Sequence, residues 1–215
     1  SPGYRTDDIF TFNVSLPAAK YDSDAARNFY RRMIEELRAV PGVQGAAAIN
    51  YVPTTNWGLN GPFAVIGQPP FDPKAPPVTE YRTVTPGYFA VMGIPVIRGQ
   101  EFAPANGAGA RPVVLVNQVM VAKYFQGMDP IGARMQFGRP DITYEVIGVV
   151  GDVRDATLDR APVPTVYAPH AQNAVNGMGI VLRLAEGIRL DAVIAGVRQR
   201  ISAIDTDLPL IRPQM

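Results

Sequence analysis

Two segments with the same order of patterns lie near opposite ends of the chain, and they limit the fold more than any other feature. Near the beginning, residues 9–16 alternate apolar with polar or small side chains, which is typical of a half-buried strand. Residues 22–24 offer helix-capping side chains, and apolar residues recur at helical spacing from Ala26 to Leu37. Residues 43–52 are rich in small apolar side chains. The first unit is therefore predicted to be strand, helix, strand.

The same order returns near the other end of the chain. Residues 180–184 alternate like a strand, Asp191 can cap a helix, and residues 208–211 can form a further strand. The apolar stripe of this helix consists of Val193, Ile194, Val197, Ile201 and Ile204. Two strand-helix-strand units are the parts of a ferredoxin-like split fold. We predict an α+β protein in which residues 1–55 and 172–215 form one discontinuous ferredoxin-like subdomain.

The residues between the two units, 56–171, have a different texture. Turns rich in proline and glycine separate short apolar segments, which is typical of a loop-rich and mostly β insertion. Thr85-Pro86 fits the start of a short helix and Gly93 its end, and a second short helix is expected from Asn117 to about Gly127. The strands predicted here are 78–84, 113–116, 143–150 and 163–167.

The bulk composition excludes several classes of function. With 20 Lys+Arg against 19 Asp+Glu, the net charge of +1 gives no general electrostatic reason to expect a nucleic acid as partner. The absence of cysteine excludes a disulfide framework, thiol catalysis and cysteine metal sites. No apolar run approaches the roughly 18 residues that span a bilayer, and the first residues lack the order of a signal peptide. We expect a soluble piece trimmed from a longer protein with flanking membrane segments.

Candidate catalytic residues are few. His170, the single histidine, has no cluster of polar partners in its neighbourhood, so we interpret it as a surface or loop residue rather than a base. The sequence contains neither Gly-x-Ser-x-Gly nor His-Glu-x-x-His, the local signatures of serine hydrolases and zincins. One histidine without cysteine does not supply the usual ligands of a transition metal. We therefore assign no catalytic, cofactor-binding or metal-binding residue.

The glycines at Gly148 and Gly151 follow an apolar strand, as in the turn of a nucleotide-binding unit. The full Gly-x-Gly-x-x-Gly is missing, and Asp152 and Asp155 would repel phosphate. We therefore favour a structural strand end over a phosphate site.

Acidic residues alternate with basic ones just after this strand. Arg154 and Arg160 can neutralise Asp152, Asp155 and Asp159 in pairs, so we expect a solvated loop, with a calcium site as the alternative. The same two interpretations apply to Asp205 and Asp207.

Aromatic residues are the remaining candidates for recognition. We expect Trp57, the single tryptophan, to fill the seam between the two subdomains, with contact to a partner as the alternative. Tyr88-Phe89 and Tyr124-Phe125 are interpreted as core anchors of the two short helices rather than as recognition residues. Asn13-Val14-Ser15 matches a glycosylation sequon, but the strand pattern places it in a sheet, where a chance match is the better explanation.

An ordered series of short motifs covers nearly the whole chain. It runs through Tyr4-Arg5-Thr6-Asp7, Val84-Thr85-Pro86-Gly87-Tyr88-Phe89, Met92-Gly93-Ile94-Pro95, Val114-Leu115-Val116-Asn117, Tyr124-Phe125, Asp129-Pro130-Ile131-Gly132, Val146-Ile147-Gly148-Val149-Val150-Gly151-Asp152-Val153, Val166-Tyr167-Ala168-Pro169 and Leu208-Pro209. The series resembles the extracytoplasmic core of MacB/FtsX-type ABC transporter permeases, in particular the long permeases of acidobacteria. It departs from the family at Gln100, where a basic residue is expected, in a motif that looks like a turn.

The resemblance implies a domain held between the first two membrane helices of a permease half, in the inner membrane and facing the periplasm. It implies a ferredoxin-like "porter" part and an inserted "sabre" part, which agrees with the subdomains at 1–55 plus 172–215 and at 56–171. The implied partners are an ABC ATPase subunit or domain, a second permease half in a dimer, and a periplasmic protein or cargo. The sequence has no Gly-x-x-x-x-Gly-Lys-[Ser/Thr], so ATP chemistry is expected elsewhere.

The sequence-based hypothesis is a non-catalytic module that transmits motion of the membrane helices to that partner or cargo. A periplasmic sensor or ligand-binding domain is the alternative, and it would predict a deep pocket with convergent polar groups, around Trp57 and the proline-rich turns. An enzyme that uses Gly148 to Asp152 is a third interpretation.

Overall fold

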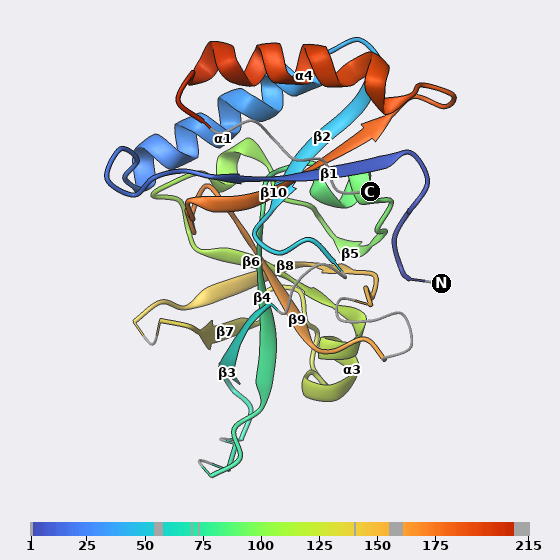
Figure 1. Ribbon diagram of the computed structural model, residues 1–215. Coiled ribbons are helices and arrows are strands. Elements are labelled where there is room, and N and C mark those ends of the chain that lie inside the picture. Colours follow the sequence, from blue (N-terminus) through green and yellow to red (C-terminus); the bar gives the residue numbers. More distant parts are fainter. Residues whose placement is uncertain are drawn as a thin grey trace.

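Two helices cover one face of a three-stranded sheet at one end of the molecule. The computed structural model describes residues 2–53, 58–69, 71–72, 74–139, 141–154 and 161–208. In it, α1 (Ser23–Arg38) and α4 (Leu190–Ile204) pack side by side (Figure 1). The strands beneath them are β1 (Ile9–Ser15), β10 (Gly177–Leu184) and β2 (Val43–Ile49). The predicted α+β class is confirmed.

Helix α1 forms where the sequence predicts it. The side chain of Asp22 accepts a hydrogen bond of 2.8 Å from the amide of Ala25, which satisfies one free N–H of the first turn. One face of the helix is buried, and Gly42 follows the helix with a φ of 91°, in the left-handed region that glycine adopts without strain. The buried face consists of Ala26, Phe29, Tyr30, Met33, Ile34 and Leu37.

The order β1-β10-β2 is that of a split β-α-β unit. β10 is antiparallel to both neighbours, with Ile9 opposite Arg183 and Gly179 opposite Ile49, so β1 and β2 run parallel with β10 between them. The predicted last strand, 208–211, lies outside the described residues except for Leu208, which is in a bend.

Helix α4 differs from the prediction at its start. It begins at Leu190 after Arg189, and Asp191 lies in the first turn, where it pairs with Arg189 instead of capping the helix. An acidic side chain in the first turn is favoured by the helix dipole, so it needs no capping role there. Val193, Val197 and Ile201 are buried, as the apolar stripe predicts.

The remaining strands continue the sheet away from the two helices. In the described residues, the strand order is β1-β10-β2-β4-β3-β7-β8-β6-β9, with β5 paired to β8 and β9 also paired to β4. These elements are β3 (Leu59–Val65), β4 (Val78–Val84), α2 (Tyr88–Met92), β5 (Val96–Gly99), a 3₁₀ turn (Pro104–Asn106), β6 (Val113–Asn117), α3 (Gln118–Tyr124), β7 (Arg134–Phe137), β8 (Tyr144–Val150) and β9 (Thr165–Pro169).

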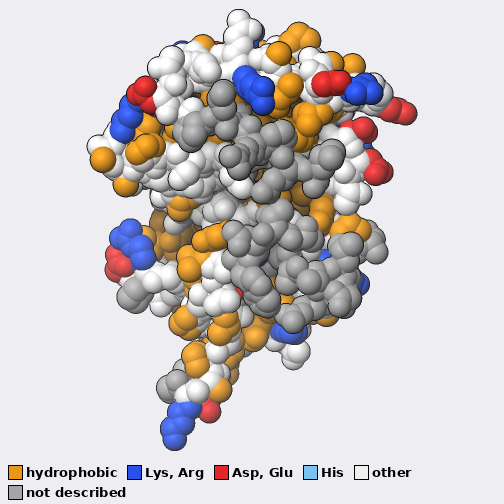
Figure 2. Space-filling model, in the orientation of Figure 1, with side chains coloured by type: hydrophobic (Ala, Val, Ile, Leu, Met, Phe, Trp, Pro, Cys, Tyr) orange, Lys and Arg blue, Asp and Glu red, His pale blue; other side chains and the backbone are white. Residues whose placement is uncertain are grey.

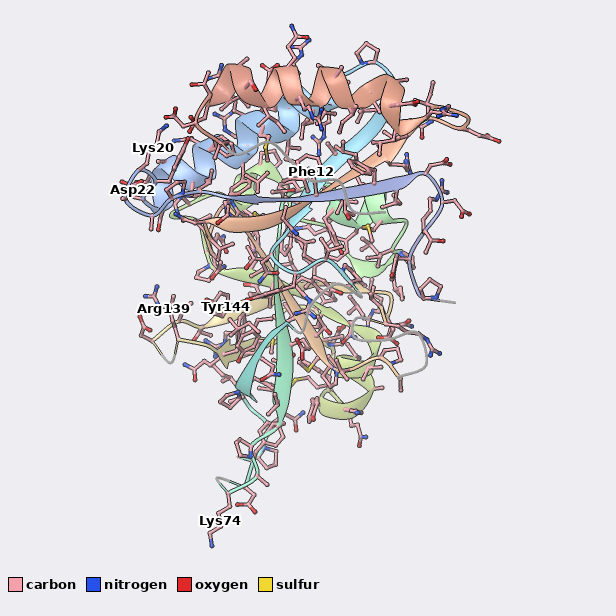
Figure 3. All side chains as sticks on the ribbon, in the orientation of Figure 1. Phe12, Lys20, Asp22, Lys74, Arg139 and Tyr144 are labelled. Atoms are coloured by element: carbon pink, nitrogen blue, oxygen red, sulfur yellow. The ribbon has the colours of Figure 1, made fainter. Side chains whose placement is uncertain are left out.

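Three strands of this region are absent from the sequence prediction. β3 contains Pro62, which cannot donate to a ladder, and the strand changes partner from β4 to β7 directly after it. β5 and β7 have four residues each: all four of β5 are exposed and show no alternation, whereas the alternation in β7 spans only four residues, at the lower limit of a strand signal. The β3–β4 hairpin extends away from the rest of the molecule, with Lys74 at its far end (Figures 1 and 3).

The two short helices confirm one predicted start and correct the other. Asn117 caps α3 by accepting from the amide of Met120 at 3.1 Å, although the helix ends at Tyr124 rather than near Gly127. α2 begins at Tyr88 after Gly87, later than the predicted Thr85-Pro86 start, because the Thr85 hydroxyl is engaged by the backbone of β2. Gly93 ends α2 in the left-handed conformation, as predicted.

Buried apolar side chains form three clusters. The first lies under α1 and α4, the second lies where β2 meets β4, and the third lies around β6 and β8. The first draws its buried residues from 10–48 and 178–201 alone, whereas the second combines Ala47, Ile49 and Val181 with residues of the central region. The subdomain boundaries at 55 and 172 stay a prediction.

Gly148 offers a test of the packing in β8. A Cβ at this position would lie 2.5 Å from the carbonyl oxygen of Gln100 and 3.0 Å from Leu115. Gly148→Ala should therefore lower the free energy of unfolding by about 1–3 kcal/mol in urea denaturation. Gly177→Ala in β10 is the matched control, because no atom lies within 4 Å of its Cβ position. Equal stability of the two variants would contradict the packing described.

Candidate functional site

The junction between β2 and β4 joins the helix-covered end to the rest of the sheet. The two strands share one ladder pair, Ile49 opposite Val84. Side chains extend this short contact: the amide of Ala48 donates to the Thr85 hydroxyl at 2.8 Å, and the amide of Thr83 donates to Asn50 Oδ1 at 3.0 Å. The amides of Thr85 and Asn50 return bonds of 2.9 and 3.0 Å to the carbonyls of Ala48 and Thr83. The junction is therefore a continuous hydrogen-bonded connection.

Arg38, at the end of α1, strengthens the junction from outside. Its guanidinium donates to the carbonyl oxygens of Ala46, at 3.0 and 3.2 Å, and of Pro86, at 3.1 Å. The amide of Gly87 donates to Glu101 at 2.8 Å, and burial raises the pKa of that carboxyl. Helix α1, strand β2 and the start of α2 are thus tied through one side chain.

Apolar packing fills the inside of the junction. Phe89 packs edge-on against Tyr167 with ring centroids 5.1 Å apart, and both side chains are buried. Ala47 and Ile49 of β2 and Val181 of β10 belong to the same cluster. The two ends of the molecule are therefore joined by packing as well as by hydrogen bonds.

His170 is buried at this junction, which corrects the surface interpretation. It is 3% exposed, directly follows β9, and packs edge-on against Tyr30 of α1 with centroids 5.1 Å apart. Its Nε2 lies 3.0 Å from the carbonyl oxygen of Val175. Burial lowers the pKa of His170, because the charged ring would lose its hydration. It is a loop residue, as predicted, but it joins the turn after β9 to α1.

A second connection lies at the exit of α4. The carboxylate of Asp205 accepts from Lys20 Nζ at 2.9 and 3.0 Å, from the Tyr21 hydroxyl, and from the amide of Asp207 at 3.0 Å. The hydrogen bond from Tyr21, followed by those from Lys20 and Asp207, lowers the pKa of Asp205 to about 2. Burial raises the pKa of Tyr21 to about 12. We call Lys20, Tyr21 and Asp205 the latch, because they tie the end of α4 to the loop after β1.

The latch corrects the solvated-loop interpretation of Asp205. Its carboxylate is 6% exposed, whereas that of Asp207 is 79% exposed and fits the interpretation. The sequence shows each charge but not the pairing, because Lys20 and Asp205 lie far apart along the chain. An ion pair between residues far apart in the chain leaves no local pattern in the sequence from which it could be predicted.

Residues 148–152 form a strand end, as favoured. Gly148 lies within β8, and a Cβ at Gly151 would meet the ring of Pro95 at 3.0 Å, so both glycines allow close packing. Asp152 is half-buried rather than fully solvated, and its carboxylate accepts from the amide of Val119 at 2.9 Å, in the first turn of α3. Asp155, Asp159 and Arg160 lie outside the described residues, so the calcium alternative stays a prediction.

The aromatic pairs are core residues. Tyr88, Phe89 and Phe125 are buried, and Tyr124 packs edge-on against Phe63 at 4.8 Å. Asn13 lies within β1, as expected for a sequon in a strand. Trp57 lies outside the described residues.

Comparisons with known proteins agree with this architecture. The family model described as the MacB-like periplasmic core domain matches residues 4–200. The chain belongs to this family. A curated relative, the macrolide export ATP-binding/permease protein MacB of Campylobacter fetus subsp. fetus (strain 82-40), is 28% identical over 105 residues. That stretch makes up 46% of this MacB-like chain and 16% of the relative, so the chain corresponds to a small part of the longer protein.

Solved structures of the same kind share the fold. The periplasmic region of MacB from Actinobacillus actinomycetemcomitans superposes with a TM-score of 0.64 at 14% identity, over 99% of this chain and 90% of that one. The extracellular domain of the transporter YknZ from Gram-positive bacteria gives 0.61 at 13%, over 96% and 100%. A domain of a permease protein from Porphyromonas gingivalis gives 0.56 at 15%, over 97% and 91%.

The described residues of this MacB-like domain offer few groups for chemistry. No three His, Cys, Asp or Glu side chains in them come together as a metal site would require. No helix in the same residues has the length and apolar character that crossing a membrane demands. On the face drawn in Figure 2, acidic and basic side chains lie beside one another instead of forming a basic patch.

The latch predicts a specific dependence on Asp205. Asp205→Asn should lower the melting temperature at pH 7 measurably, because it removes the acceptor charge from Lys20. Asp207→Asn is the control, since its exposed ion pair with Lys20 contributes little. The pKa of Asp205 falls from an ordinary 3.8 to about 2, so its stabilisation is complete above pH 3.8 and is lost as the pH falls through about 2.

The difference between wild type and Asp205→Asn should therefore shrink between pH 4 and pH 2 as the carboxylate becomes protonated. Circular dichroism melts over this range measure it. Identical melting temperatures for the wild type and Asp205→Asn at pH 7 would show that the latch does not stabilise the fold.

Proposed function

We propose that this chain is the extracytoplasmic, non-catalytic domain of an inner-membrane ABC transporter permease, and that it couples nucleotide-driven motion of the membrane helices to a periplasmic partner or cargo. The observation that carries the proposal is the continuous junction at Ile49 and Val84. A module that transmits motion must keep the distance and the orientation between its two ends constant. The hydrogen bonds through Thr85 and Asn50, together with the buried cluster, support such rigidity.

The latch supports the same proposal from the other side of the domain. Asp205 follows α4 directly, and its bonds to Lys20 and Tyr21 hold the exit of that helix against the loop after β1. A displacement applied to either chain end would therefore reach the helix-covered sheet as a whole. Without the latch, the end of α4 could separate from the loop after β1 before the sheet moves.

The partners follow from family membership and remain part of the proposal. They are an ABC ATPase subunit or domain, a second permease half in a dimer, and a periplasmic protein or cargo for efflux or for lipoprotein or peptide transport. Nucleic acid is not among them, since the net charge is +1. The sequence lacks a Gly-x-x-x-x-Gly-Lys-[Ser/Thr] loop, which supports ATP hydrolysis by another domain or subunit.

The β3–β4 hairpin supports a division of labour within the domain. It projects away from the end that carries α1 and α4, with Lys74 at its tip (Figure 3). Under the proposal, the helix-covered end receives the motion and the opposite end delivers it.

The two alternative functions are a ligand-binding role and an enzyme at residues 148–152. The enzyme is the weaker alternative, because Gly148 and Gly151 are closely packed and form no phosphate-binding loop.

Spin labels on the full-length transporter test the coupling. The chain has no cysteine, so Lys123→Cys on α3 labels each permease half at one exposed position of this domain. Double electron–electron resonance should show that the distance between the two Lys123→Cys labels changes when ATP is bound. An unchanged distance distribution would refute the coupling.

A second label within the same copy tests rigidity. Arg32→Cys lies exposed on α1, and labelled copies diluted with unlabelled ones report the distance from Arg32→Cys to Lys123→Cys within one domain. This distance should stay constant with and without ATP. A nucleotide-dependent change in this distance would contradict rigid-body transmission and would indicate a hinge inside the domain.

A further inference from the structure

A cavity of about 310 Å³ opens beside the junction. It lies between α1 and the strands below, and its wall combines Arg27 of α1 with Arg139 and Tyr144 around the β7–β8 connection. Gln172 and Asn173, in the connection from β9 to β10, complete the polar part of the wall. Figure 3 shows Arg139 and Tyr144 next to one another, on the side of the molecule where α1 begins. This cavity is not the pocket that the ligand-binding alternative predicts around Trp57.

The charges of the wall have one sign. Arg27 and Arg139 line the cavity, and no lining residue is acidic. Arg27 pairs with Asp24, and Arg139 pairs with Asp141 at 3.1 Å. A guanidinium has five N–H donors, of which one carboxylate takes two at most, so both arginines retain donors for a further anion.

One buried donor of the wall has no partner. The side-chain Nδ2 of Asn173 is buried and makes no hydrogen bond to any described residue. Its Oδ1 accepts from the Tyr144 hydroxyl at 3.3 Å, so the amide is held with its oxygen engaged and its N–H groups unsatisfied. Buried donors are nearly always paired in folded proteins, so this unpaired donor marks an incompletely satisfied part of the wall.

The rest of the wall is apolar and small. It is formed by Ala108, Ala110, Pro112 and Ile142, together with the ring of Tyr144. Cavities that bind small molecules span roughly 300–1,000 Å³ and combine such surfaces with a few polar groups. This cavity is at the lower end of that range, which limits the ligand to a small molecule.

We infer that the cavity binds a small organic carboxylate, with its anionic group on Arg27 and Arg139, next to the Asn173 side chain, and its short apolar part against Ile142 and Pro112. The site goes beyond the proposed coupling function and does not depend on it. Because Arg27 belongs to α1 and Arg139 to the β7–β8 connection, a bound ligand bridges two parts of the domain. Occupancy therefore stabilises their mutual placement.

N-acetylalanine is a suitable probe, because it presents one carboxylate on a small apolar group. In a titration followed by ¹H–¹⁵N NMR, it should shift the Asn173 side-chain amide and the Gly109 backbone amide with one saturable curve. N-acetylalanine amide, which has the same shape without the charge, should produce no saturable shift. Arg139→Gln should raise the dissociation constant at least about tenfold, and Arg27→Gln should do the same.

Arg198→Gln is the matched control, because Arg198 is exposed on α4 and does not line the cavity; it should leave the dissociation constant unchanged. Arg139 is 68% exposed, so its variant should fold normally even if Arg27→Gln does not. The inference is overturned if N-acetylalanine gives no saturable shift, if the neutral amide binds equally well, or if Arg139→Gln binds as the wild type does. Saturable binding of inorganic phosphate without binding of N-acetylalanine would also overturn it.

Discussion

The single ladder pair between Ile49 and Val84 is the constraint on which the rest of the structure depends. A contact this short would be a hinge if backbone bonds alone held it. Thr85 and Asn50 prevent this, because each supplies a side-chain acceptor to an amide across the junction and so extends the ladder beyond its last backbone pair. Arg38 and the Phe89–Tyr167 contact brace the same place from two sides.

This arrangement gives physical meaning to membership in the MacB-like periplasmic core family. The solved relatives share the fold at 13–15% identity, so the architecture persists between them although most of their side chains differ. The proposed transmission of motion rests on this architecture, in which a hydrogen-bonded junction joins the helix-covered end to a projecting hairpin. The cavity between Arg27 and Arg139 adds a place where a small molecule could adjust that connection.

The sequence predicted those parts of the structure that depend on near neighbours in the chain. Helix α1, the Asn117 cap and strand β4 follow from local periodicity and capping, and their bounds agree closely with the structure. Strands β3 and β5 escaped prediction because their partners, and not their own patterns, make them strands, and β7 escaped it because its alternation spans only four residues. For the same reason the burial of His170, the role of Thr85 and the pairing of Lys20 with Asp205 are visible only in three dimensions.

The position of β10 has a consequence for how the chain acquires this fold. β10 lies between β1 and β2, yet it is made after all the strands from β3 to β9. Until residues 177–184 arrive, β1 and β2 have a strand-wide gap between them and unpaired backbone groups along both facing edges. Contacts over such long sequence separation slow folding. During synthesis of this chain the helix-covered sheet therefore stays open until residues 177–184 have been made, when nearly the whole domain is complete.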